Sequence, residues 1–403
     1  MNKQSDVAAT TICIMYEIHS YLYMPAPEPP PTQTIRKLLE AYVIDPNPLG
    51  LAAGKSDYSP QDITKQITLA ALPTNRSIHD ISHIQPSPTP RTTLNWLYKT
   101  PPNRIIDSIN SYIARTYARQ IKIRLRGAFA FINIDTHLEP YWGKPTEWTV
   151  RSRRSKGSGQ HMKIETFSIQ LEEFKITLLV RQFHRPGRSK KPTRREIEDW
   201  VEGYIRALNW IKKTYIPRVA LLCIVFDGEY FDTFLLSGID EVGYFFITRA
   251  TLGATGIRSL VKQEKIRETL RPSRYIEYEY VLKTKRVWPP KILKIRLIFG
   301  WKGSELVALV TNLPESFSPA TIFEIYARRF WIENTYRDGR LFRVRTRSRR
   351  FSVRLAFFLI GLVLLNFFWF IRFVLSVCLP FRVLSLLVFL SFVFVGSVGP
   401  IWT

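Results

Sequence analysis

The sequence predicts an α/β fold with a mixed sheet, and three features of residues 128–227 carry this prediction. Residues 128–134 and 219–226 are nearly continuous apolar runs, as in strands that are buried on both faces. Two shorter strand-like segments and one amphipathic helical segment lie between these runs. A strand, a hairpin, a helix and a returning strand together give a mixed sheet with a crossover connection.

Each of the two apolar runs ends in an aspartate, Asp135 after the first run and Asp227 after the second. If the two strands are parallel neighbours, both aspartates lie at the carboxyl edge of the sheet, where ligand sites of α/β folds form. Two carboxylates at such short range repel each other unless a cation lies between them. The sequence therefore predicts a cation-binding pair at this edge.

The segments between the two aspartates predict a hairpin followed by a helix. Residues 163–170 and 174–181 are strand-like and are separated by a short acidic turn. Thr193 and Glu196 have the spacing of a capping box, which marks the first turn of a helix. Apolar residues follow at helical spacing: Ile197, Val201, Ile205, Leu208 and Ile211.

The sequence next predicts a helix over residues 230–240, a strand over residues 244–249 and a β-rich insertion at about residues 250–312. A long helix is expected to begin near Ser318, which suits an N-cap, with Pro319 in its first turn. The insertion is inferred from strand-like runs at residues 275–282, 292–299 and 306–310.

Residues 1–122 are expected to form a mainly helical N-terminal region. Short helical patterns at residues 35–42 and 92–98 precede a longer helix at residues 105–117. Two short helices joined by a turn, ahead of a basic body, suit a helix-turn-helix that binds DNA. A plain helical packing domain explains the pattern equally well, because no recognition-helix residue can be named.

The composition indicates a polyanionic partner. The chain has 403 residues, enough for two or three domains, and a formal net charge of +25. A basic surplus of this size points to nucleic acid or to an anionic membrane, although a generally basic proteome would also produce it. The three cysteines are far apart, so neither a zinc site nor a disulfide framework is expected. We expect a cytoplasmic protein.

The helix that begins near Ser318 carries an unusual stripe of charge. At about 100° per residue, one acid and several basic or aromatic residues share one face. Such a face suits contact with phosphates, with one carboxylate reserved for a metal ion, whereas a surface helix with Glu–Arg pairs is the simpler alternative. The residues on this face are Tyr326, Arg329, Glu333, Arg337 and Arg340.

This stripe resembles the motif Y-x2-R-x3-E-x6-K, which marks the YREK group of bacterial and archaeal insertion-sequence transposases. Arg340 stands where the family usually has lysine; arginine keeps the charge and adds a bidentate fork for phosphate, so phosphate binding is expected to be kept. Residues 134–143 (IDTHLEPYWG), 226–231 (FDGEYF) and 311–314 (TNLP) resemble further blocks of archaeal members, in the same order. The resemblance covers about residues 90–370.

The resemblance implies a transposase with an RNase H-like catalytic core at residues 123–372. It implies that Asp135, Asp227 and Glu333 hold two Mg²⁺ ions, with Mn²⁺ as the alternative, and that no small-molecule cofactor is needed. The implied partner is double-stranded DNA, at the ends of the element and at the target, bound by a homodimer. DNA contacts are expected from Tyr326, Arg329, Arg337, Arg340, Arg343, Arg345 and Arg347.

The C-terminal residues support a rival hypothesis. Residues 355–371 and 383–398 each approach the length of a membrane span, which would suit a membrane-anchored protein. We expect the first run to be the closing helix of the core and residues 373–403 to be an apolar tail of uncertain role. A nuclease or DNA-binding relative that has lost transposition is the third hypothesis. The residues expected to pack on the sheet are Leu355, Phe358, Leu359, Leu362 and Phe370.

Overall fold

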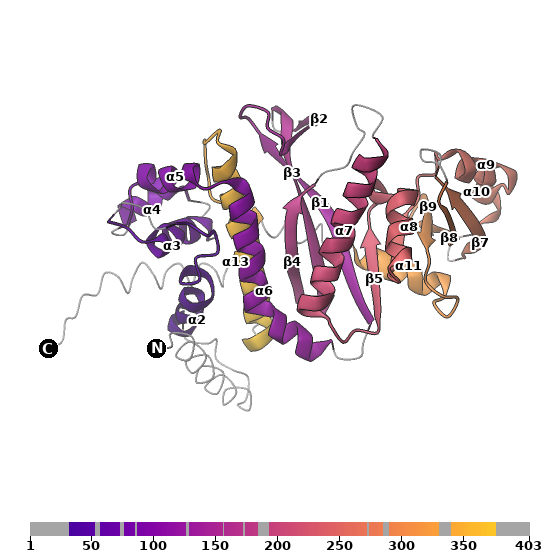
Figure 1. Cartoon of the computed structure of the whole chain (residues 1–403), viewed down its shortest axis with the longest axis horizontal. Coiled ribbons are helices and arrows are strands. Elements are labelled where there is room, and N and C mark those ends of the chain that lie inside the picture. Colours follow the sequence, from indigo (N-terminus) through magenta and orange to yellow (C-terminus); the bar gives the residue numbers. More distant parts are fainter. Residues whose placement is uncertain are drawn as a thin grey trace.

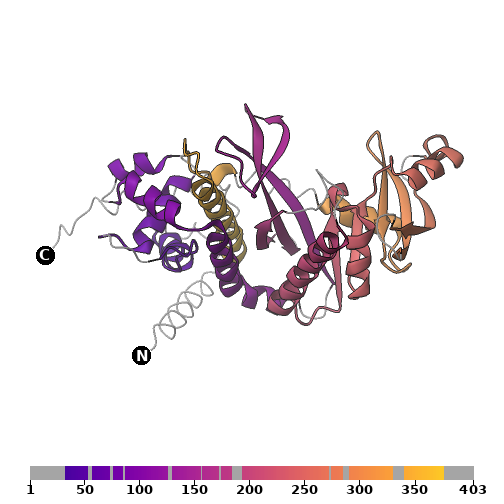
Figure 2. The same cartoon turned by 45° about the horizontal axis from the view of Figure 1, so that its top comes forward.

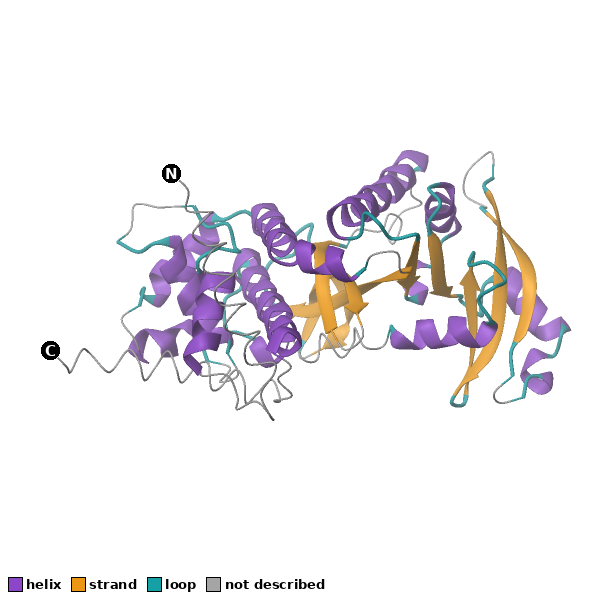
Figure 3. Cartoon of the chain, turned by 90° about the horizontal axis from the view of Figure 1, so that it is seen from below, coloured by secondary structure: helices purple, strands orange, loops and turns teal. Residues whose placement is uncertain are grey.

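The structure is a computed structural model, and it places helices at one end, a large sheet in the middle and a second group of strands at the other end (Figures 1 and 2). Seen from below, helices flank the strands on both sides (Figure 3). The mixed α/β class is therefore as the sequence predicts. The residues that the structure describes are 32–52, 57–72, 76–84, 87–125, 129–155, 157–171, 174–183, 193–271, 274–284, 290–329 and 340–375.

The centre of the sheet has the order β4-β3-β1-β5-β6. β3 is antiparallel to both β1 and β4, whereas β5 is parallel to β1 and β6 is parallel to β5. This is the predicted strand, hairpin and returning strand, and it agrees with an RNase H-like core. The strands are β1 (Phe129–Tyr141), β2 (Thr149–Ser155), β3 (Ser158–Leu171), β4 (Phe174–Gln182), β5 (Leu221–Phe226) and β6 (Phe245–Arg249).

Two helices make the crossovers of this sheet. α7 (Arg194–Tyr215) begins with the predicted capping box, in which the Thr193 hydroxyl accepts from the Glu196 N–H and the Glu196 carboxylate accepts from the Thr193 N–H. α8 (Thr233–Glu241) starts three residues later than predicted. The reason is that a 3-10 turn, η2 (Gly228–Tyr230), follows β5 before the helix begins.

The predicted β-rich insertion at about residues 250–312 contains three strands, β7 to β9. β9 pairs antiparallel with β6, so these strands extend the central sheet and leave β6 with no free edge. Helices also form at residues 255–269, because apolar residues recur there at spacings of three and four. The elements are α9 (Thr255–Gln263), α10 (Ile266–Thr269), β7 (Ile276–Lys283), β8 (Ile292–Lys302) and β9 (Glu305–Thr311).

The N-terminal region is helical, as expected, and packs around α13 (Phe351–Leu375) (Figure 1). Its side chains belong to the same buried cluster as those of the sheet. The packing by itself does not choose between a helix-turn-helix and a plain helical domain. The elements are α2 (Thr32–Leu39), η1 (Glu40–Ile44), α3 (Pro60–Ala71), α4 (Ile78–Ile84), α5 (Pro90–Lys99) and α6 (Pro102–Arg124).

Within the described residues, one helix, Phe351–Arg372, is long and apolar enough to cross a membrane, and most of it is buried inside the protein. Its one amide side chain, Asn366, accepts from the Thr177 N–H at 3.0 Å and donates to the Thr177 carbonyl at 2.9 Å. Asn110 of α6 makes the same pair of bonds to Val180, at 2.8 Å each. Side chains from two helices thus bond the backbone groups of Thr177 and Val180 in β4. These bonds and its burial make α13 a helix of the protein core.

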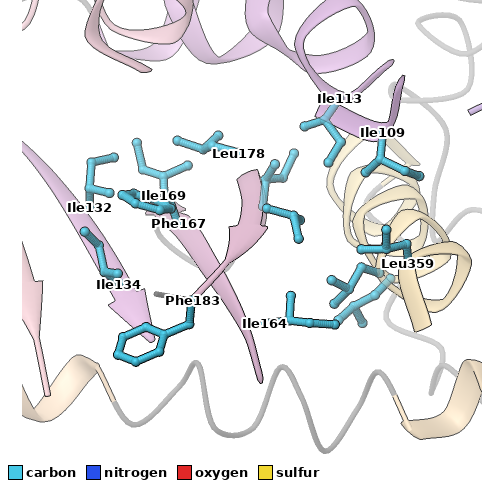
Figure 4. Close-up of a cluster of buried hydrophobic side chains, with 14 of the residues drawn as sticks. Ile109, Ile113, Ile132, Ile134, Ile164, Phe167, Ile169, Leu178, Phe183 and Leu359 are labelled. Carbon is cyan, nitrogen blue, oxygen red and sulfur yellow. The ribbon is translucent and has the colours of Figure 1, made fainter. Parts of the chain in front are cut away.

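The expected packing of this helix is confirmed in part. The Phe358 ring stacks on His137 of β1, with ring centroids 5.1 Å apart. Leu359 joins the buried cluster that includes Ile164 of β3 and Ile109 of α6 (Figure 4). Phe370, in contrast, packs on Tyr42 and Tyr117 of the N-terminal helices. The second apolar run, residues 383–398, lies outside the described residues.

Candidate active site

Asp135 and Asp227 are neighbours at the carboxyl end of β5. The last residue pair of the parallel β1–β5 ladder is Ile134 with Phe226, and the two aspartates come directly after it. β5 ends there, whereas β1 continues to Tyr141. The Asp135 side chain is 11% exposed and that of Asp227 is 45% exposed, so the pair lies at the border between the core and solvent.

The two aspartates also share one face of the sheet. Side chains alternate along a strand, so Asp135 is on the same face as Phe131, and Asp227 is on the same face as Val225. Phe131 and Val225 belong to the smaller buried cluster, together with Tyr326 of α11 (Pro319–Arg328). The motif helix therefore packs on the face that carries both carboxylates, as the resemblance requires. Ser318 caps this helix as predicted, because its hydroxyl accepts from the Thr321 N–H.

A single guanidinium lies between the two carboxylates. Arg329 Nη1 is 3.7 Å from Asp135 Oδ1, and Arg329 Nη2 is 3.5 Å from Asp227 Oδ1. The Arg329 side chain is only 4% exposed, and its guanidinium lies over the Tyr326 ring, 5.4 Å from the centroid. Burial raises the pKa of the Tyr326 hydroxyl, and the neighbouring Arg329 opposes this rise. The positive charge between Asp135 and Asp227 is thus supplied by Arg329, a residue of the predicted stripe.

Backbone contacts hold both carboxylates in place. The Thr136 N–H donates to Asp135 Oδ1 at 2.9 Å, and the Gly228 N–H donates to Asp227 Oδ1 at 2.7 Å. The Thr248 hydroxyl of β6 donates to the Asp227 carbonyl at 3.1 Å. The Thr248 bond ties the turn after β5 to β6, and the two N–H bonds fix each carboxylate against the backbone of the residue that follows it.

A buried ion pair supports the same turn and was not predicted. Lys163 of β3, which is almost fully buried, is paired with Glu229 of η2. Glu229 also accepts from the Thr136 hydroxyl at 3.1 Å, and the Lys163 ammonium lies over the Phe183 ring. The sequence does carry a signal for this ion pair, because Lys163 lies in a strand directly between the apolar residues Met162 and Ile164.

A second buried carboxylate, Glu165, joins four elements behind the site. It accepts from Arg181 of β4, from the Tyr204 hydroxyl of α7 and from the Tyr230 hydroxyl of η2. Burial, followed by the charge of Glu165, raises the pKa of Tyr230 well above its ordinary value, so this hydroxyl stays protonated as a donor. Glu165 is thus a structural centre that anchors η2, the turn that follows Asp227.

Three residues of the predicted stripe have no described side chain. Glu333 and Arg337 lie outside the described residues, and Arg340 begins the short turn η3 (Arg340–Phe342), where its side chain is not described. Among the residues that are described, no group of three or more His, Cys, Asp or Glu side chains is arranged to hold a metal ion. Asp135 and Asp227 are thus brought together, and metal binding by these two residues and by Glu333 stays a prediction.

The basic segment at residues 343–350 has no regular secondary structure, and its first residues are alternately buried and exposed. Phe342 and Val344 are buried, whereas Arg345 and Arg347 are exposed. Arg343 is paired with Glu139 near the end of β1. All three arginines line a cavity of about 830 Å³, so they surround one concave surface.

Trp301 of β8 has a structural role. Its indole N–H donates to the Leu270 carbonyl at 2.8 Å, and its ring packs against the main buried cluster.

Comparison with known proteins shows the fold but not the family. No family model matches the sequence, and no curated protein matches it either. Among solved structures, the chain is similar to the cryo-EM structure of a piggyBac transposase synaptic complex with hairpin DNA. The TM-score is 0.58 at 12% identity, over 93% of this chain and 83% of that chain. The protein thus has a transposase-like fold, and its membership of the YREK group stays a prediction.

Proposed function

We propose that this protein is a DNA transposase that binds the ends of an insertion sequence, cleaves the DNA and joins the ends to target DNA. The observation that carries the proposal is the convergence of Asp135 and Asp227 at one sheet edge, beneath the helix that holds Tyr326 and Arg329. It is supported by a fold similar to that of a DNA transposase. The net charge of +25 suits double-stranded DNA as the partner.

The aspartate pair suits hard divalent cations. Carboxylate oxygens are the ligands that Mg²⁺ and Mn²⁺ prefer, and two carboxylates that already share one cation show that positive charge is stabilised at this place. When bound, two such ions would activate the attacking oxygen and stabilise the leaving oxygen. Asp135, Asp227 and the proposed third ligand Glu333 would hold them.

The chain's own residues would perform the remaining tasks. The Thr136 and Gly228 N–H groups hold one oxygen of each carboxylate and so fix the orientation of both side chains. Arg345 and Arg347 would contact the DNA backbone, which adds affinity that depends on salt and not on sequence. We further propose a homodimer that acts in the cytoplasm without a small-molecule cofactor.

The test is a cleavage assay with DNA that spans the junctions between the element and its flanks, in Mg²⁺ or Mn²⁺. Asp135→Asn and Asp227→Asn should each abolish cleavage while DNA binding is retained. Asp232→Asn, which alters the cap of α8, is the matched control and should stay active. If either active-site variant cleaves like the wild type, the catalytic assignment fails. Binding by the wild type without cleavage would instead favour the DNA-binding relative.

A further inference from the structure

Two exposed aromatic rings form the walls of a cavity away from the aspartate pair. Tyr98 lies at the end of α5 and is 43% exposed, and Trp142 follows β1 and is 41% exposed. Both line a cavity of about 980 Å³ where α5, the end of β1 and the beginning of α13 meet. Large apolar rings left in contact with water at a concave site are typical of ligand-binding surfaces.

The charge around this cavity is entirely positive. No Asp or Glu side chain is among the described residues that line it, and four cations are: Lys99, Lys144, Arg349 and Arg350. The Arg350 guanidinium lies 5.5 Å from the centroid of the Tyr98 ring, and the Arg354 guanidinium lies 4.8 Å from that of the Trp142 ring. A cation over one ring face orients each ring and leaves the rest of it accessible.

The cavity is held by contacts between its walls. The Tyr141 hydroxyl donates to the Arg349 carbonyl at 2.9 Å, and the Arg354 guanidinium donates to the Ser348 carbonyl at 2.7 Å. Gly143 packs so closely on Tyr141 and Arg349 that a larger side chain there would collide with both. The segment that carries the cations is therefore fixed against the end of β1.

We propose that this cavity binds unpaired nucleotides of a DNA strand, with bases stacked on Trp142 and Tyr98 and phosphates near the surrounding cations. Bases stack on aromatic side chains regardless of sequence, and a positively charged groove follows the backbone. An acidic peptide would use the cations but would not need two exposed rings. The combination of flat apolar surfaces with cations, and without carboxylates, matches a nucleotide.

The position of the cavity separates it from the reaction centre. Trp142 comes seven residues after Asp135, and at about 3.3 Å per extended residue it lies roughly 23 Å along β1 from the aspartate pair. That length corresponds to about seven nucleotides of a DNA strand. The adjoining cavity shares Trp142 and is lined by four arginines (Arg343, Arg345, Arg347 and Arg354) and two acids (Asp80 and Glu139), so positive charge is in excess there too. The cavity therefore suits a strand that is unpaired away from the cleaved bond.

The inference rests on DNA being the partner in the proposed function, but not on cleavage, so binding is measured on the full chain in the presence of a metal chelator. The probes are a fluorescent single-stranded oligothymidine and an abasic oligomer of the same length and charge. The wild type should bind the oligothymidine at least about tenfold more tightly, since two bases are expected to stack and each contributes about fivefold or more.

Trp142→Ala and Tyr98→Ala should each reduce binding of the oligothymidine by about fivefold or more and leave binding of the abasic oligomer unchanged. Trp142→Phe and Tyr98→Phe keep a ring and should retain most of the preference. Lys144→Ala should reduce the binding affinity for both probes by the same factor. Tyr275→Ala removes another exposed tyrosine, near β7, and is the matched control that should change neither. Both aromatic sites are exposed, so the variants are expected to fold.

Equal affinity of the wild type for the two probes would overturn the inference, and so would an unchanged preference in both alanine variants. A protein that binds neither probe but binds duplex DNA also overturns it, while the proposed function stands. If the protein binds no DNA of any kind, both the inference and the proposed function are wrong. Asp135→Asn should retain the preference for the oligothymidine, because the cavity does not include the aspartate pair.

Discussion

The guanidinium of Arg329 lies 3.5 Å from the carboxylate of Asp227, and the same group lies 3.7 Å from Asp135. A single arginine thus offsets part of the negative charge of the pair that is proposed to bind metal ions. Positive charge from the protein and from a metal would compete for the same oxygens. Metal binding is therefore expected to release Arg329, which would then be available for the phosphate contact that the motif implies.

Arg329→Gln tests this competition. The variant should lose about 1–3 kcal/mol of stability without metal, because two carboxylates are left without their shared cation while Asp227 remains half exposed. Mn²⁺ should then raise its unfolding temperature more than that of the wild type, because a ligand that binds only the folded state stabilises it. Arg328→Gln removes an exposed neighbouring charge and is the control. Equal metal-induced shifts in wild type and Arg329→Gln would rule out competition.

Lys163 and Glu229 should act as one unit that positions Asp227. Lys163→Met leaves Glu229 without its buried partner and should cost about 1–3 kcal/mol in urea unfolding, since Glu229 keeps some contact with water. It should also lower cleavage, because the turn after Asp227 loses an anchor. Adding Glu229→Gln should restore part of the stability. Strictly additive effects in the double variant would show that the two residues are independent.

Much of this site could be predicted from the sequence, because strand burial and strand ends leave a strong pattern. The apolar runs before Asp135 and Asp227 identify both carboxylates, and their shared edge follows from the parallel pairing. The partner of Arg329 could not be predicted, because helical spacing gives the face of a helix and not what that face meets. The same limit applies to Lys163, whose partner is 66 residues away in the chain.

The sheet extension was missed for a related reason. Strand-like runs show that strands form but do not say which strands pair, so β9 could not be assigned to the edge of β6. The amide pairs made by Asn110 and Asn366 were missed because each depends on where two helices meet β4. Long-range pairing is set by the three-dimensional arrangement and is only weakly encoded in local pattern.

Arg345 and Arg347 should supply affinity for DNA without sequence preference. Replacing both with alanine should weaken binding to any duplex and reduce the slope of log affinity against log salt by about one unit for each phosphate that is no longer neutralised. The control replaces Lys262 and Lys294, which are also exposed but lie on α9 and β8. Weaker binding to one sequence only, or an equal effect in the control, would contradict binding of the DNA backbone by these arginines.

Tyr230 should make stability depend on alkaline pH. Its pKa lies well above the ordinary value of 10.0, chiefly because of burial and then because of Glu165. Above pH 10 the unfolded chain therefore releases this proton while the folded protein keeps it, so stability falls as the pH rises. Tyr230→Phe should reduce that fall by about 1.4 kcal/mol per pH unit in urea unfolding. Identical slopes in wild type and variant would show that Tyr230 does not carry the effect.

Asn366→Leu distinguishes a core helix from a membrane span. The substitution makes α13 more apolar, which would favour insertion into a membrane. In the core, however, it removes the partners of the Thr177 N–H and carbonyl and should cost about 2 kcal/mol or more. Asn110→Leu on α6 removes the equivalent bonds to Val180 and should cost about as much. Unfolding free energies and flotation with lipid vesicles measure both effects. Destabilisation by Asn110→Leu alone, with Asn366→Leu moving folded protein to the vesicles, would assign α13 to the membrane instead.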